Sequence, residues 1–171
     1  MANSGDLLIT NKGGSYRIQV SGRATFECAP SLRNLAKKLE TESFKEIRID
    51  LTKCSWMDST FMGILAMLAL RARKLNAPIY VCNASEQNAG LLCGLGLKKF
   101  FQFITDDAAE SENGEGAWND DAPGAPDRSA RTVLEAHQTL MNVDEQNIKK
   151  FEKVVGMVQK DIDRMNENKN N

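Results

Sequence analysis

Asp58, Ser59 and Thr60 are the residues of this chain whose types and spacing best suit a chemical role. They follow an expected strand over residues 46–51 and precede a very apolar expected helix over residues 61–75. The first turn of a helix carries unpaired backbone N–H groups and a partial positive charge, so it favours an oxygen acceptor. Asp58 and Ser59 are therefore typical of a helix cap. A phosphate on Ser59 would be well placed at the same position.

Other groups for catalysis or metal binding are scarce in the sequence. No GxxxxGK[ST] phosphate loop and no GxSxG nucleophile turn occurs. We interpret the single histidine, His137, as a packed residue rather than a ligand. No CxxC spacing joins the cysteines, and we expect reduced, mostly buried thiols at Cys28, Cys54, Cys82 and Cys93. We therefore expect a protein that is not an enzyme, with no catalytic residue, no cofactor and no metal site.

Composition narrows the class of protein further. A net charge of -1 with 42% hydrophobic residues indicates a globular protein without the basic surface that nucleic-acid binding requires. No run approaches the roughly 18 apolar residues of a membrane span, so we expect no membrane insertion. The N-terminus lacks a basic stretch followed by an apolar core, which is the pattern of a signal peptide. These observations predict a cytoplasmic protein.

Hydrophobic periodicity predicts the elements that position Asp58 and Ser59. Strict alternation over residues 15–21 and 46–51, after a first strand at residues 6–11, predicts strands with one buried and one wetter face. Helices are therefore expected mainly on one side of the sheet. Further patterns predict a helix at residues 30–40, a central helix at 61–75, a strand at 78–82, a helix at 85–95 and an edge strand within 98–104.

Beyond residue 105 the composition changes sharply. We expect a domain over residues 1–105, an acidic flexible linker over 106–128 and a C-terminal amphipathic helix or helical hairpin over 129–171. Trp118, inside the expected linker, is either a docking anchor or without a role. A seam with heptad spacing predicts a coiled coil, formed by Leu134, His137, Met141, Asp144, Ile148, Phe151, Val155, Val158, Ile162 and Met165.

Two questions about the C-terminal segment stay open from the sequence. The seam implies a partner surface, which is the chain's own domain, a second copy that would make a homo-oligomer, or another protein. Residues 142–145 also read as a fresh helix start, so the segment is either one rod or two helices.

The order of elements around Asp58 and Ser59 resembles a STAS domain, the anti-sigma factor antagonist domain of bacterial partner-switching systems. The resemblance covers about residues 6–104 and is carried by IRIDL and WMDSTFMGIL. Asp50 and Leu51 stand where the family has its strand-ending Asp-Leu, and residues 58–63 stand where it has DSSGLG. The resemblance implies an α/β fold, a STAS-like mixed sheet of four to five strands with helices mainly on one face, here with a C-terminal helical extension.

The resemblance also implies a function. Ser59 takes the place of the serine that a partner kinase phosphorylates, and the implied partners are an anti-sigma factor or related serine kinase and a phosphatase. The partner surface implied by the motif and by the loop after the second strand comprises Asp58, Ser59, Thr60, Phe61, Met62 and Thr25. Phe61 replaces a glycine of the family pattern, so we expect a bulkier surface. Thr25 stands where the family often has a carboxylate.

We carry two hypotheses forward. In the first, the chain is an interaction switch: the Ser59 hydroxyl faces outward, a partner binds there, and phosphorylation releases it. In the second, the chain is a non-phosphorylated STAS scaffold of a larger signalling or transport-associated complex, and the C-terminal helix supplies the association.

Overall fold

The computed structural model describes residues 5–106 and 126–171, which form one mixed sheet and a set of helices. The strands are β1 (Asp6–Lys12), β2 (Ser15–Ala24), β3 (Glu46–Met57), β4 (Ile79–Cys82) and β5 (Gln102–Ile104). The helices are α1 (Ala29–Lys38), α2 (Ser59–Lys74), α3 (Glu86–Gly94), α4 (Pro126–Val143) and α5 (Gln146–Lys169), with a 3-10 turn at Lys98–Phe100.

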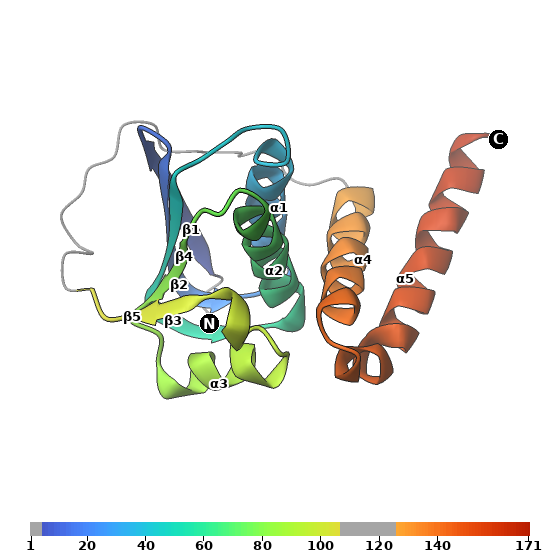
Figure 1. Ribbon diagram of the computed structural model, residues 1–171. Helices are drawn as coiled ribbons and strands as arrows, with labels where there is room; N and C mark the ends of the chain where they lie inside the picture. The colour runs from blue at the N-terminus through green and yellow to red at the C-terminus, as the bar shows by residue number, and fades with distance from the viewer. Residues whose placement is uncertain (1–4, 107–125) are drawn as a thin grey trace.

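The sheet has the strand order β1-β2-β3-β4-β5. β1 runs antiparallel to β2, and the remaining neighbours are parallel. Figure 1 shows α1, α2 and α4 on the same side of this sheet, with α5 farthest from it. The expected mixed sheet with helices mainly on one face is therefore confirmed. Apolar and polar residues alternate in β2 and β3 because helices cover mainly one face of the sheet.

α2 is the central helix of the fold. Ten of its sixteen residues are buried, because α2 lies between the sheet and α4 (Figure 1). Beneath it, the inward-facing residues Ile18, Ile47 and Ile49 are fully buried. A helix covered on two sides needs apolar residues around most of its circumference, as its sequence predicts.

β3 is longer than the strand expected at residues 46–51. It continues to Met57 because β2 also continues, through register irregularities, until Ala24 pairs with Met57. The Asp58 N–H then donates to the Ala24 carbonyl at 2.9 Å. The motif therefore starts directly at a strand end, and the pairing places the loop after β2 beside it.

The C-terminal segment is two helices rather than one rod. α4 ends at Val143 and α5 begins at Gln146, and the Asp144 Oδ1 atom accepts the Gln146 N–H at 2.9 Å. We call these two helices the hairpin below. The hairpin packs against its own domain, which is one of the three partner surfaces that the sequence left open. Association with a second copy or with another protein stays a prediction. Trp118 and most of the expected acidic linker lie outside the described residues, and the expected domain boundaries stay predictions.

The seam expected for the C-terminal segment coincides only in part with the buried stripe, at His137 of α4 and Ile162 of α5. The α4 residues buried most deeply are Thr132, Ala136, His137 and Leu140. Leu134 and Met141 of the expected seam are only half-buried, and Ile148 is 40% exposed. Alanine and threonine carry little hydrophobic signal, so periodicity of large apolar residues does not find the stripe that faces the domain.

The cysteines follow the expectation in part. All four are free thiols; Cys54 and Cys82 are buried, Cys28 is half-buried and Cys93 is exposed. Burial raises the pKa of the Cys28 thiol to about 11, so this side chain is a neutral thiol near neutral pH.

Candidate functional site

Asp58 is the structural centre of the site. It is the N-cap of α2, and its Oδ1 atom accepts the Phe61 N–H at 2.8 Å. Its Oδ2 atom accepts the Phe26 N–H at 2.8 Å. The cap interpretation is therefore confirmed, and the same carboxylate also holds the loop between β2 and α1 against the start of α2.

Ser59, the first residue of α2, contacts the hairpin. Its Oγ atom lies 2.9 Å from Nε2 of His137 on α4. The His137 Nδ1 atom lies 2.7 Å from the Val133 carbonyl oxygen, which can only accept a hydrogen bond. Nδ1 therefore carries a proton, and in the neutral ring Nε2 accepts the hydrogen bond from the Ser59 hydroxyl. The imidazole also packs on Phe151 of α5, with ring centroids 4.9 Å apart.

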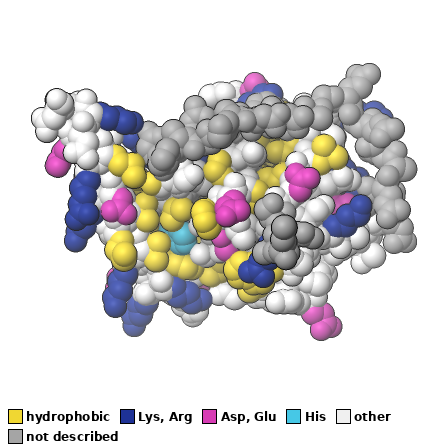
Figure 2. Space-filling view, turned by 180° about the vertical axis from the view of Figure 1, so that it is seen from behind, with side chains coloured by type: hydrophobic (Ala, Val, Ile, Leu, Met, Phe, Trp, Pro, Cys, Tyr) yellow, Lys and Arg dark blue, Asp and Glu magenta, His cyan; other side chains and the backbone are white. Residues whose placement is uncertain are grey.

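The Ser59 hydroxyl points to His137, which is only 4% exposed, while Ser59 itself is half-buried. In Figure 2 the single histidine, in cyan, shows as a small area among hydrophobic side chains. α4 packs along α2 and covers one side of the serine, so the access of a partner or a kinase to Ser59 stays a prediction. His137 is a packed residue, as interpreted from the sequence, but it is also the hydrogen-bond partner of the motif serine.

Three other residues of the expected partner surface lie inside the protein. Thr60, Phe61 and Met62 are buried because they belong to the first turns of α2, which is covered by the sheet and by α4. Phe61 is completely buried, so its replacement of the family glycine fills the core and does not enlarge the surface. Thr25 is half-buried in the loop beside Asp58, and its carbonyl accepts the Cys28 and Ala29 N–H groups.

An ion pair that sequence reasoning missed joins α4 to α1. The Arg33 guanidinium donates two hydrogen bonds to the Glu135 carboxylate, at 2.8 and 2.9 Å. Lys37 lies 3.4 Å from the same carboxylate. The two partners are 102 residues apart in sequence, so the only local signal was a row of cations on the outer face of α1.

Gly63 allows α4 to approach α2 closely. A Cβ atom built on Gly63 would lie 2.7 Å from the Cβ of Ala136 and would also collide with the Ala136 carbonyl. Real Cβ atoms essentially never come closer than 3.0 Å to such neighbours. Glu135, Ala136 and His137 thus contact Arg33, Gly63 and Ser59 respectively, and we call these three contacts the α4 interface.

The turn of the hairpin is fixed to the other end of the domain. Asn147 is buried, and its Nδ2 group donates to the carbonyls of Leu95 and Leu140, at 3.0 and 2.8 Å. The Lys150 ammonium donates to the Gly94 carbonyl at 3.0 Å. The hairpin is therefore held to α1, to α2 and to the end of α3.

An exposed aromatic rim remains beside Asp58. Phe26, whose N–H binds Asp58, is 51% exposed. The guanidinium carbon of Arg23 lies 4.6 Å from the ring centroid of Trp56 at the end of β3. Phe26, Arg23 and Trp56 are the aromatic rim below. Aromatic residues and arginine are enriched at protein interfaces, so this rim is the part of the motif region that a partner can touch while α4 is in place.

The ion pair at Glu135 predicts acid sensitivity of the hairpin. Partial burial pushes the pKa of the Glu135 carboxyl upward, but the hydrogen bonds and charges of Arg33 and Lys37 outweigh it, so the pKa lies below its ordinary value. A lowered pKa in the folded state means that the ionised carboxylate stabilises the fold above the ordinary carboxyl pKa, and that this contribution is lost as the pH falls through the lowered value.

We expect Glu135→Gln to lower the free energy of unfolding by about 1 kcal/mol near neutral pH. The loss should shrink toward zero as the pH falls through the lowered pKa, because the native carboxylate is then itself protonated. Urea unfolding at several pH values measures both effects. Glu152→Gln, on the exposed surface of α5, is the control and should change little. A Glu135→Gln effect of equal size at all pH values would contradict the assigned ion pair.

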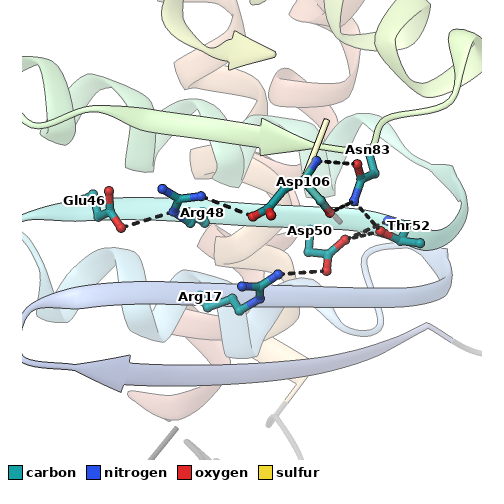
Figure 3. Close-up of polar contacts among 7 residues, drawn as sticks. All are labelled: Arg17, Glu46, Arg48, Asp50, Thr52, Asn83 and Asp106. Carbon is teal, nitrogen blue, oxygen red and sulfur yellow. Dashed lines mark hydrogen bonds and ion pairs between the residues drawn. The ribbon is translucent and has the colours of Figure 1, made fainter. Parts of the chain in front are cut away.

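A second polar cluster lies on β2 and β3 and just beyond the ends of β4 and β5 (Figure 3). Arg17 pairs with Asp50 at 3.4 Å, and Arg48 pairs with Asp106 at 3.2 Å. The Asn83 side chain exchanges hydrogen bonds with the backbone of Asp106 and also donates to Thr52. The carboxylates neutralise the cations and the polar groups bind one another, so we assign this cluster to fixing the end of β5 rather than to ligand binding.

Within residues 5–106 and 126–171, no three His, Cys, Asp or Glu side chains gather as a metal site would need. None of the helices in these ranges combines the length and the apolar character that crossing a bilayer requires.

Comparisons with known proteins agree with the fold. The family model described as Mlab, STAS domain matches residues 8–105, more than half of the chain. The anti-sigma factor antagonist SpoIIAA in its unphosphorylated form is similar in structure, with a TM-score of 0.53 and 14% identity over 61% of this chain and 92% of that chain. The phosphorylated form of the Bacillus cell fate determinant SpoIIAA gives a TM-score of 0.52 and 14% identity over 61% and 96%.

An anti-sigma factor antagonist from Mycobacterium paratuberculosis gives a TM-score of 0.48 and 22% identity over 59% of this chain and 86% of that chain. No curated protein sequence matches the chain. The family match ends at residue 105, so α4 and α5 lie outside it.

Proposed function

Because the chain belongs to the STAS domain family, we propose that it is a non-enzymatic regulator of the anti-sigma factor antagonist kind. It binds an anti-sigma factor or a related serine kinase at the start of α2, and phosphorylation of Ser59 switches that binding. A phosphatase returns the chain to its unmodified state.

The single observation that carries this proposal is the hydrogen bond between Ser59 and His137. It places the motif hydroxyl at the first turn of α2, where backbone N–H groups favour an anion. It also couples the state of Ser59 to a separate segment of the chain. The Oγ and Nε2 atoms are 2.9 Å apart. Phosphorylation replaces the hydroxyl proton that Ser59 donates to His137, so a phosphate on Ser59 removes this hydrogen bond to α4.

The charge of the modification supports a switch. Phosphorylation adds about 1.5 to 2 negative charges at pH 7. In a close interface that charge repels carboxylates and must be stripped of water, which weakens binding. The aromatic rim, defined by Phe26, Arg23 and Trp56, supplies side chains of the type that anchor protein interfaces.

Full-length Ser59→Ala and Ser59→Asp variants test the proposal. Used as bait in lysate of the native cells, native chain and Ser59→Ala are expected to recover one defined partner, and Ser59→Asp to recover it roughly tenfold less, about 1.4 kcal/mol. Ser31→Asp, which adds the same charge in the first turn of α1, is the matched control and should behave as native. Equal recovery by all four baits would refute the switch.

A second function is favoured by the covering of Ser59 itself. A hydroxyl that already binds His137 beneath α4 is the arrangement expected of a scaffold that is never phosphorylated. In this alternative the chain is a permanent subunit of a larger signalling or transport-associated complex. Mass measurement on protein from native cells separates the two: phosphate on Ser59 in any growth condition supports the switch, and its absence in every condition supports the scaffold.

A further inference from the structure

We propose that the face of α1 and α2 beneath α4 is a docking surface for an amphipathic helix of a partner protein, and that α4 is a resident helix which such a partner replaces. The inference rests on the proposed function only in placing the partner at the start of α2. The inference adds the chemistry of the partner's binding segment. That segment is a helix with a carboxylate, a small residue and a hydrogen-bonding side chain at three successive positions.

The chemistry of the α4 interface defines this occupant. The surface offers a guanidinium at Arg33, a gap over Gly63 and a hydroxyl at Ser59. α4 meets them with three consecutive residues, 135–137. Successive residues on a helix point about 100° apart, so three in a row reach these groups only if the helix lies against both α1 and α2. Gly63 restricts the central position to a side chain no larger than alanine.

The family domain ends before the hairpin, although Ala136 and Leu140 of α4 pack into its hydrophobic core. The family match stops at residue 105. The two SpoIIAA structures align over 92% and 96% of their own length with only 61% of this chain, so folds of this kind close with almost no residues left over for such a hairpin. α4 and α5 are therefore an addition to the part of the chain that matches the family.

The interface has the composition of an exchangeable contact. Of the four most buried α4 side chains, only Leu140 is a large aliphatic; the others are Thr132, Ala136 and His137. The anchors are polar: one ion pair and hydrogen bonds from Ser59 and Asn147. Such mixed contacts resemble transient interfaces more than a domain core.

We favour replacement of α4 by a partner helix over simple detachment of α4, because of the surface that α4 covers on α2. α2 beneath it is an apolar helix in which ten of sixteen residues are buried. Soluble proteins rarely leave large contiguous apolar patches exposed. The surface is therefore stable only with a helix on it, which is either the resident α4 or the helix of a partner.

Ala136→Leu in the full chain tests the inference, because this substitution changes the resident helix α4 and not the docking surface on α1 and α2. Ala136 is completely buried beside Gly63, so we expect the larger leucine to weaken docking of α4 while the surface on α1 and α2 keeps its residues. The probe is a fluorescent synthetic peptide with the native sequence of residues 129–145, and its binding is measured by fluorescence anisotropy.

We expect the peptide to bind Ala136→Leu at least about tenfold more tightly than the native chain, because every tenfold preference for the resident helix lowers the apparent affinity tenfold. Gln138→Leu, which adds the same side chain on the exposed face of α4, is the matched control and should match native. Adding Arg33→Ala to Ala136→Leu, or leucine in the peptide at position 136, should remove most of the gain.

Hydrogen exchange on the same variants decides whether α4 is a separable unit. We expect Ala136→Leu to lose amide protection in α4 while β2 and β3 keep theirs. Glu135→Lys, which repels Arg33 and Lys37, is a second route to the same state if Ala136→Leu folds poorly. Loss of protection in the sheet together with α4 in both variants would overturn the inference, because α4 would then be part of the core.

Three binding results would also overturn it: no peptide binding to a variant with a protected sheet, binding that ignores Arg33→Ala, or a dimer of the variant that excludes the peptide and so assigns the surface to a second copy. None of these measurements involves phosphorylation. These measurements therefore test the helix-docking surface independently of the Ser59 switch, so that either proposal can fail while the other stands.

Discussion

Gly63→Ala is expected to displace α4 from α2, although the substitution adds a single methyl group. The new Cβ atom would lie 2.7 Å from the Cβ of Ala136 and collide with the Ala136 carbonyl. A backbone carbonyl on a neighbouring helix cannot rotate away as a side chain can, so the two helices must separate. Crowding of this kind typically costs about 1–3 kcal/mol.

Gly90→Ala is the matched control for Gly63→Ala. Gly90 also lies inside a helix, α3, and a Cβ atom there would have no neighbour within 4 Å. Alanine favours a helix over glycine by up to about 1 kcal/mol, so Gly90→Ala should be neutral or stabilising. Urea unfolding measures both, and hydrogen exchange locates the change in α4. Similar unfolding energies for the two variants would show that α4 does not rest on Gly63.

Asp58→Ala is the second substitution with a large expected effect. The carboxylate satisfies two backbone donors, the N–H groups of Phe61 and Phe26, both at 2.8 Å. Loss of an N-cap costs about 1 kcal/mol. The Phe26 N–H lies in an exposed loop, so its hydrogen bond adds about 0.5–1.5 kcal/mol. We expect the free energy of unfolding to fall by about 2 kcal/mol and the aromatic rim to lose its fixed position.

Ser85→Ala provides the comparison for Asp58→Ala. Ser85 caps α3 through one hydrogen bond, from the Asn88 N–H at 3.1 Å, so its loss should cost only about 1 kcal/mol. Asp58→Asn keeps one carbonyl oxygen as acceptor and should fall between the two. Thermal and urea unfolding give the energies, and exchange at the Phe26 amide reports the loop. An Asp58→Ala cost no larger than that of Ser85→Ala would mean that the second hydrogen bond contributes nothing.

The residues around the motif show which features the sequence could predict. The cap at Asp58 was predictable because an N-cap needs only one acidic residue and the next turn of the same helix. The position of β2 and β3 followed from alternation, which depends on neighbouring residues alone. The extension of β3 to Met57 was missed, because it depends on pairing with Ala24 across a register shift in another strand.

The surroundings of Ser59 were not predictable, because they depend on contacts between distant segments. His137, 78 residues away, was correctly interpreted as packed, but its hydrogen bond to Ser59 has no sequence signature. The stripe of α4 that faces the domain consists mainly of small and polar residues, so a search for large apolar residues at heptad spacing chose Leu134 and Met141 instead. The small side chain of Ala136 matters only because α4 contacts α2 at Gly63, and the sequence alone does not show that contact.

The amino-acid sequence by itself determined the α/β class, the one-sided layering and the place of Asp58 and Ser59 at the start of a buried helix. These features follow from periodicity and capping, whose energies arise within a few residues of one another. Only the tertiary structure decided that α4 lies over that helix and holds the motif hydroxyl. That outcome depends on how closely two helices approach at Gly63 and on an ion pair between residues 102 apart, and such long-range geometry leaves no periodic trace in the chain.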